Sequence, residues 1–123
     1  MTLRYVLDEH LRGPLWHAIR QHNAAGAYPI DATRVGDPPD LPLGSADLFI
    51  LEWAEREDRV VVSADYKTMP GHLKTHLRAG RHLAGLFIIR PRSSVPDVVA
   101  HLALAGHAAD PAAMRDTSEF IPP

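Results

Sequence analysis

The run RVVVSAD at residues 59–65 constrains the fold most strongly, because three consecutive valines suit a strand that is covered on both faces. Two further apolar runs, LRYVL at residues 3–7 and LAGLFIIRP at residues 83–91, have the same character. Segments with helical spacing of apolar residues separate them, at about 11–23, 45–58, 68–78 and 94–105. A weaker strand is expected at 30–35.

This alternation of strands and helices predicts an α/β fold with a mainly parallel central sheet of four to five strands. Since the apolar strands need cover on both sides, the helices are expected on both faces, as a three-layer α/β/α sandwich. We predict one domain over residues 1–105 and a C-terminal tail over 106–123 that is Ala/Pro-rich and poorly packed or partner-dependent.

The chain has no cysteine, which excludes disulfides and thiolate zinc sites. It also has neither an apolar run of membrane-spanning length nor a signal-peptide pattern at its start. We therefore expect a cytoplasmic protein with no membrane partner.

Acidic residues follow the predicted strands at their carboxyl ends, where parallel sheets form their ligand-binding sites. Asp8 follows the first strand and Asp65 follows the third, at the end of the run RVVVSAD, so both are expected at one edge. Asp47 begins a helix that can start at the same edge. Each acid also has an ordinary structural role, in a turn or in the first turn of a helix. A cluster of carboxylates would favour a hard cation, Mg²⁺ or Mn²⁺, and phosphoryl chemistry.

The charge of the chain is divided unevenly along the sequence. Residues 37–58 hold seven acids and one base, whereas residues 66–96 contain six Lys or Arg and no acid. A basic segment directly after Asp65 is a candidate footprint for a phosphate backbone, and a solvated basic helix face is the alternative.

The segments VLDEHL, ADLFILEWA and RVVVSADYKTMPGHL resemble the PIN-like family of small bacterial proteins over roughly residues 3–90. This resemblance implies a metal-dependent ribonuclease that uses Mg²⁺ or Mn²⁺ and acts on RNA, as the toxin of a pair with a small antitoxin protein. It implies that Asp8, Asp47 and Asp65 are both the catalytic and the metal-binding residues. Glu9 matches the motif as a secondary residue, because alternation turns it away from Asp8. Lys67 departs from the family pattern, since relatives often carry a fourth acid there.

Several residues are candidates for contact with the RNA. They are His10 beside the acids, Lys67 and Thr68 after Asp65, and the later bases Lys74, Arg78 and Arg90. His72 and His76 have the i,i+4 spacing of a zinc pair, but no Glu lies between them and exposed polar residues are the simpler interpretation.

Two other function classes fit the same residues. A non-catalytic PIN-like module that binds nucleic acid or protein would explain Lys67. A receiver-like phosphoacceptor domain would also carry acids after its first and third strands, with Arg90 in place of the expected lysine. The loop PPDLPLG and the tail are candidate contacts for an antitoxin or a second copy of the chain.

Overall fold

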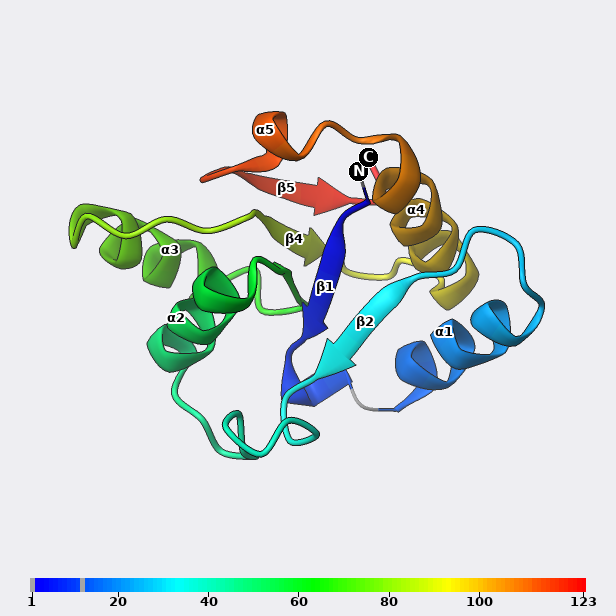
Figure 1. The fold of residues 1–123 in the computed structure, drawn as a ribbon, viewed down its shortest axis with the longest axis horizontal. Coiled ribbons are helices and arrows are strands. Elements are labelled where there is room, and N and C mark those ends of the chain that lie inside the picture. Colours follow the sequence, from blue (N-terminus) through cyan, green and yellow to red (C-terminus); the bar gives the residue numbers. More distant parts are fainter. Residues whose placement is uncertain (1, 12) are drawn as a thin grey trace.

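A computed structural model describes residues 2–11 and 13–123 of the chain. Five parallel strands form one sheet in the order β2-β1-β3-β4-β5, with helices on both faces (Figure 1). The predicted α/β three-layer sandwich is thereby confirmed, with all five strands parallel. None of the helices in the described ranges has the length and apolarity that a bilayer span requires.

The elements follow one another in a regular alternation of strand and helix. Their bounds are β1 Arg4–Leu7, the 3₁₀ turn η1 Glu9–Leu11, α1 Pro14–Ala24, β2 Asp31–Arg34, α2 Asp47–Glu57, β3 Val60–Ser63, α3 Met69–Arg78, β4 Leu86–Ile89, α4 Val95–Ala108, α5 Pro111–Met114 and β5 Ser118–Ile121.

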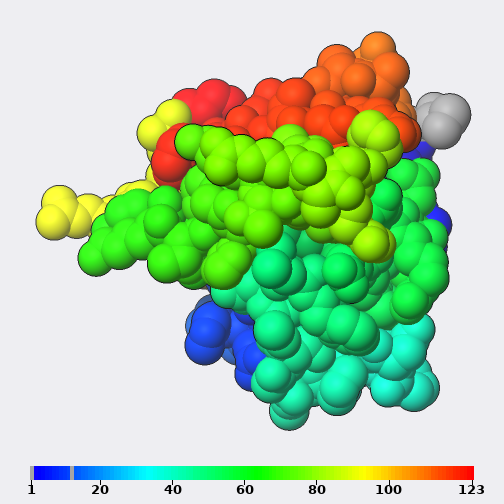
Figure 2. Space-filling view, turned by 90° about the vertical axis from the view of Figure 1, so that its left-hand side faces the viewer, coloured from blue at the N-terminus to red at the C-terminus, as the bar shows by residue number. Residues whose placement is uncertain are grey.

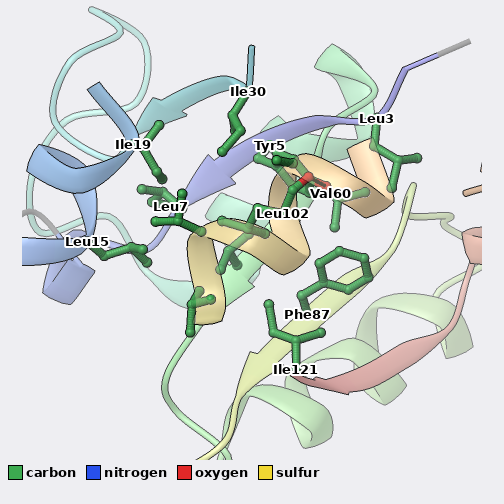
Figure 3. Packing of buried hydrophobic residues seen from close by; sticks show 14 residues of the cluster. Leu3, Tyr5, Leu7, Leu15, Ile19, Ile30, Val60, Phe87, Leu102 and Ile121 are labelled. Atoms are coloured by element: carbon green, nitrogen blue, oxygen red, sulfur yellow. Dashed lines mark hydrogen bonds between the residues drawn. The ribbon is translucent and has the colours of Figure 1, made fainter. Parts of the chain in front are cut away.

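The sheet separates two hydrophobic clusters, because successive side chains of a strand point to opposite faces. Tyr5 and Leu7 of β1 lie in the cluster under α1 and α4, which Figure 3 shows, whereas Val6 lies in the cluster under α2 and α3. The Tyr5 ring packs against Phe87 with ring centroids 5.9 Å apart, and its hydroxyl donates to the Leu102 carbonyl oxygen at 2.8 Å. Both faces of the central strands are therefore buried, as their unbroken apolar runs require.

Replacing Leu102 by Ala should lower the free energy of unfolding by about 2–5 kcal/mol, because its side chain is fully buried. Leu104 on the same helix is 69% exposed, so Leu104→Ala is a matched control with an expected change within about 0.5 kcal/mol. Urea unfolding followed by circular dichroism measures both. Equal losses in the two variants would contradict this assignment of the core.

The prediction of a poorly packed tail over residues 106–123 is wrong for its last strand. β5 pairs in parallel with β4, and Ile121 is fully buried in the cluster under α4. α4 also continues past the predicted boundary to Ala108. The sequence signal was too thin, because β5 buries only one of its four residues and therefore shows no apolar run.

The strand order reverses between β1 and β3, which continue in opposite directions across the sheet. In open α/β sheets, ligands bind outside the carboxyl ends of the strands at such a switch point. Figure 2 faces α2 and α3, and the segments that follow β1, β3 and β4 lie along its left border in blue, green and yellow. We call the end of the sheet where β1 and β3 finish the carboxyl edge; Ser63 ends β3 there, and Asp8 and Asp65 follow β1 and β3.

Candidate functional site

Asp8 is a buried carboxylate at the switch point. It follows β1 directly, its backbone N–H donates to the Val62 carbonyl oxygen at 3.0 Å, and only 5% of the residue is exposed. The Ser63 hydroxyl donates to Asp8 Oδ2 at 3.1 Å. Within residues 2–11 and 13–123, Asp8 forms no ion pair with a Lys or Arg. The Asp8 carboxyl group is therefore buried, with the Ser63 hydroxyl and the Glu9 backbone N–H as its hydrogen-bond donors.

Burial raises the pKa of Asp8 above its ordinary value. The hydrogen bond from Ser63 and the positive potential of His10 oppose this rise, whereas the negative charge of Asp47 adds to it. Asp47 is thus close enough to repel Asp8 electrostatically. Two acids that are far apart in the sequence thus influence each other electrostatically.

Asp65 is linked to Asp8 through Ser63, but the Asp65 carboxylate already accepts hydrogen bonds from its own turn. The Ser63 hydroxyl accepts from the Asp65 N–H at 3.0 Å, so one serine side chain connects the two acids. The Asp65 carboxylate accepts from the backbone N–H groups of Lys67 and Thr68, at 3.2 and 2.9 Å, and from the Thr68 hydroxyl. The Thr68 hydrogen bonds are the main reason that the pKa of Asp65 is lowered. Asp65 therefore stays ionised and closes the turn before α3.

Asp47 opens α2 and contacts a histidine of the neighbouring helix. His72 Nε2 lies 3.2 Å from Asp47 Oδ2, and about a third of each side chain is exposed. His72 also lowers the pKa of Asp65 through its positive potential. His72 therefore interacts electrostatically with both Asp47 and Asp65.

At the carboxyl edge, at most two carboxylates could serve as protein ligands of one Mg²⁺ or Mn²⁺ ion. Within residues 2–11 and 13–123, no three His, Asp or Glu side chains stand close enough to hold one metal ion together. Mg²⁺ is often held by one or two carboxylates, with waters and substrate phosphates as its other ligands. Asp8 and Asp47 are the two carboxylates that repel each other, and a cation near both would relieve that repulsion. Asp65 would have to leave Thr68 to join them.

Glu9 and His10 follow Asp8 in the turn η1. Glu9 Oε1 accepts from the Gly44 N–H at 3.0 Å, so the side chain holds the loop before α2 rather than facing Asp8. This position agrees with the secondary role expected for Glu9. His10 is exposed and acts on Asp8 through its charge.

The basic candidates are spread over a wider surface than the acids. Lys67 lies next to the site, with Nζ 5.9 Å from the centroid of the Tyr66 ring. Arg90 follows β4, where Nε donates to the Pro122 carbonyl oxygen at 2.9 Å and the guanidinium covers the Phe120 ring. Lys74 and Arg78 lie along α3, and Arg78 is ten residues, or about 15 Å of helix, beyond Thr68.

The sequence interpretation of His76 as an exposed residue is wrong. Its side chain is buried, and Nε2 lies 2.8 Å from the His82 carbonyl oxygen and 3.2 Å from Glu55 Oε1. His72 faces Asp47 instead, so the two histidines have different partners. The packing of α3 against α2 separates them, which the i,i+4 spacing alone could not indicate.

Sequence reasoning missed Ser63 as a site residue and did not assign His72 to the acids. Ser63 ends a strand whose other residues are all valine, and it is fully buried. A hydroxyl at the end of an apolar strand, two residues before an acid, is the signal that could have identified it. The role of His72 depends on how α3 lies beside α2, for which the sequence holds no signal.

Replacing Ser63 by Ala should raise the pKa of Asp8 further. The hydroxyl stabilises the ionised carboxylate by donating to it, and its loss leaves only the Glu9 backbone N–H and the charge of His10 to oppose the effect of burial. Carbon-13 NMR titration of the Asp8 carboxyl group measures the change. Ser93→Ala is the control, because the Ser93 hydroxyl donates to the Arg90 carbonyl oxygen instead. An Asp8 pKa that is the same in both variants would contradict this account.

Comparison of the chain with protein-family models, curated proteins and solved structures finds no match. The PIN-like resemblance therefore rests on the motifs themselves, and the site rests on its geometry.

Proposed function

We propose that this chain is a metal-dependent ribonuclease that hydrolyses phosphodiester bonds in RNA with Mg²⁺ or Mn²⁺ at the carboxyl edge. The observation that carries the proposal is the buried Asp8 carboxylate, whose pKa is raised and which stands close to a second acid at the switch point. Such an arrangement costs stability unless a cation neutralises it. Perturbed acids at a ligand-binding edge are also typical of functional sites.

Each residue of the site has a separate task in this reaction. Asp8 and Asp47 would hold the ion, which supplies charge neutralisation at the phosphate and acidifies a bound water. Ser63 fixes the orientation of Asp8 by its hydrogen bond. Asp65 keeps the edge negative because its carboxylate remains ionised. His10 and Lys67 would contact the RNA backbone, and Lys74, Arg78 and Arg90 would extend that contact.

We also propose that a small antitoxin protein binds next to the site and blocks it. Support comes from apolar side chains that stay exposed around the start of α2: Leu43 is 57% exposed, Phe49 42% and Leu48 38%. These three residues flank Asp47, so a partner that covers them would also cover the acid. The neighbouring Leu41 is fully buried, so only part of the loop PPDLPLG is available for such a contact.

The first experiment measures cleavage of a fluorescent single-stranded RNA by the purified chain in EDTA, Mg²⁺ or Mn²⁺. We expect cleavage with either ion and none in EDTA. Gel analysis of the products distinguishes hydrolysis at defined positions from random degradation. Cleavage that continues in EDTA would contradict the proposal. Binding of RNA without cleavage in any ion would favour the non-catalytic PIN-like module.

The strand order favours one other candidate, a receiver-like phosphoacceptor domain. The order β2-β1-β3-β4-β5 is the doubly wound arrangement in which acids follow β1 and β3. The Asp65 carboxylate, however, is held by Thr68 and the N–H of Lys67, which leaves it poorly placed as a nucleophile. Incubation with radioactive acetyl phosphate decides between them, because labelling that Asp65→Asn removes would favour the receiver.

A further inference from the structure

A small apolar pocket opens at the carboxyl edge, on the face that α1 and α4 cover. It has a volume of about 200 Å³. Its lining comes from η1, α1, β4 and α4: Leu11 ends η1, Pro14 begins α1, Ile89 ends β4, and Val95 and Val98 lie in the first turns of α4. These residues lie in η1, at the end of β4 and at the starts of α1 and α4, which are all at the carboxyl edge of the sheet. The pocket is therefore at the same edge as the acids.

The pocket and the acids share two loops. His10, which lines the pocket, is two residues beyond Asp8 and acts on it through its charge. Ala64, which also lines the pocket, lies between Ser63 and Asp65. A polymer whose phosphate lies at Asp8 would therefore carry its neighbouring group past the mouth of this pocket.

We propose that the pocket holds one unpaired nucleobase of the RNA, next to the phosphate that lies at Asp8. This inference rests on the proposed function and adds that the substrate is single-stranded. Proteins recognise single-stranded RNA by taking splayed bases onto apolar or aromatic surfaces, which a base inside a duplex cannot reach. Since Ser93 and His10 are the polar side chains of this lining, contact with the flat face of the base dominates over reading of its edges.

The charge around the pocket favours a nucleic acid over an apolar side chain of a protein partner. Arg90 and Arg92 follow β4 at its border, in the yellow segment that projects at the left of Figure 2. No acid occurs between residues 66 and 96. A polyanion would be attracted to this border, whereas an apolar side chain would gain nothing from it.

The test compares short single-stranded RNAs that lack one base at a time. The bond that the wild-type chain cleaves is first mapped, and an abasic nucleotide is then placed at each position around it. Binding to the full chain is measured in EDTA by fluorescence anisotropy. We expect about a tenfold or greater loss of affinity at one position next to the cleaved bond, since stacking of one base on a protein surface has an effect of that size.

Val95→Phe fills the pocket and should weaken binding of the intact RNA to the level of that abasic RNA. Ala100→Phe is the matched control, because it places the same side chain on an exposed part of α4 outside the pocket lining. Unchanged urea unfolding shows that both variants remain folded, and Ala100→Phe should retain metal-dependent cleavage at the wild-type rate.

Two results would overturn the inference. Equal affinity for all the abasic RNAs, or RNA binding that Val95→Phe leaves unchanged, would mean that no base enters the pocket and would leave it to an apolar side chain of a protein partner. Metal-dependent cleavage would then still support the ribonuclease. If the wild-type chain neither binds nor cleaves RNA, both the proposed function and the base pocket are wrong.

Discussion

Replacing Asp8 by Asn should reduce the rate of metal-dependent RNA cleavage by at least about a hundredfold. A bound metal ion contributes several kcal/mol to stabilising the reacting phosphate, and each ~1.4 kcal/mol corresponds to a tenfold change in rate. The amide has nearly the same shape as the carboxylate and can still pair with Ser63, so the fold should be retained. Single-turnover cleavage at saturating RNA measures the loss.

Asp97→Asn is the matched control for this loss. Asp97 is an exposed acid in the first turn of α4, as Asp47 is an acid in the first turn of α2, but of these two only Asp47 adds to the pKa rise of Asp8. We expect Asp47→Asn to impair cleavage as Asp8→Asn does, and Asp97→Asn to have little effect. A rate that is equal in the wild type and Asp8→Asn would reveal a contaminating nuclease and contradict the assignment of the site.

Mn²⁺ or Mg²⁺ should raise the melting temperature of the wild-type chain, because the ion binds only the folded state. At about a hundredfold excess over the dissociation constant, binding adds roughly 2.7 kcal/mol, or about 8–12 °C for a domain of this size. Asp8→Asn should lose most of that shift. Differential scanning calorimetry with and without each ion measures it, and Ca²⁺ tests whether the site accepts a larger ion. A wild type whose melting temperature does not respond to any of these ions would contradict the metal site.

Without a metal ion, Asp8→Asn should raise the free energy of unfolding of the chain at neutral pH. Burial raises the pKa of Asp8 in the folded state above that in the unfolded chain. As the pH rises from the ordinary aspartate value of about 4, the unfolded state loses its proton first, so the stability of the folded wild type falls until Asp8 ionises too. Asn cannot ionise. The advantage of Asp8→Asn should therefore be absent at low pH and appear through this window.

The central strands could be predicted from the sequence because their environment permits little choice. Val60, Val61 and Val62 are buried on both faces of the sheet, and only a continuous apolar run can fill such a position. The parallel arrangement then placed Asp8 and Asp65 at one edge without further information. β5 could not be predicted in the same way, since its exposed Ser118 and Glu119 carry no apolar pattern.

The arrangement of the site depends on contacts that no single segment determines. That Asp65 would close a turn with Thr68 follows from local chemistry and could have been predicted from the sequence. That Asp47 would contact His72 requires the packing of α2 against α3, which depends on the buried apolar residues that both helices contribute to one hydrophobic cluster. Sequence reasoning therefore identified the acids but not the side chains that orient them.

The most direct test of the central claim is anomalous diffraction from a crystal of the wild-type chain soaked in Mn²⁺. We expect an anomalous peak at the carboxyl edge, about 2.1–2.2 Å from oxygen atoms of both Asp8 and Asp47. A peak bound to other residues, or no peak at Mn²⁺ concentrations that saturate cleavage, would show that these two acids do not hold the ion.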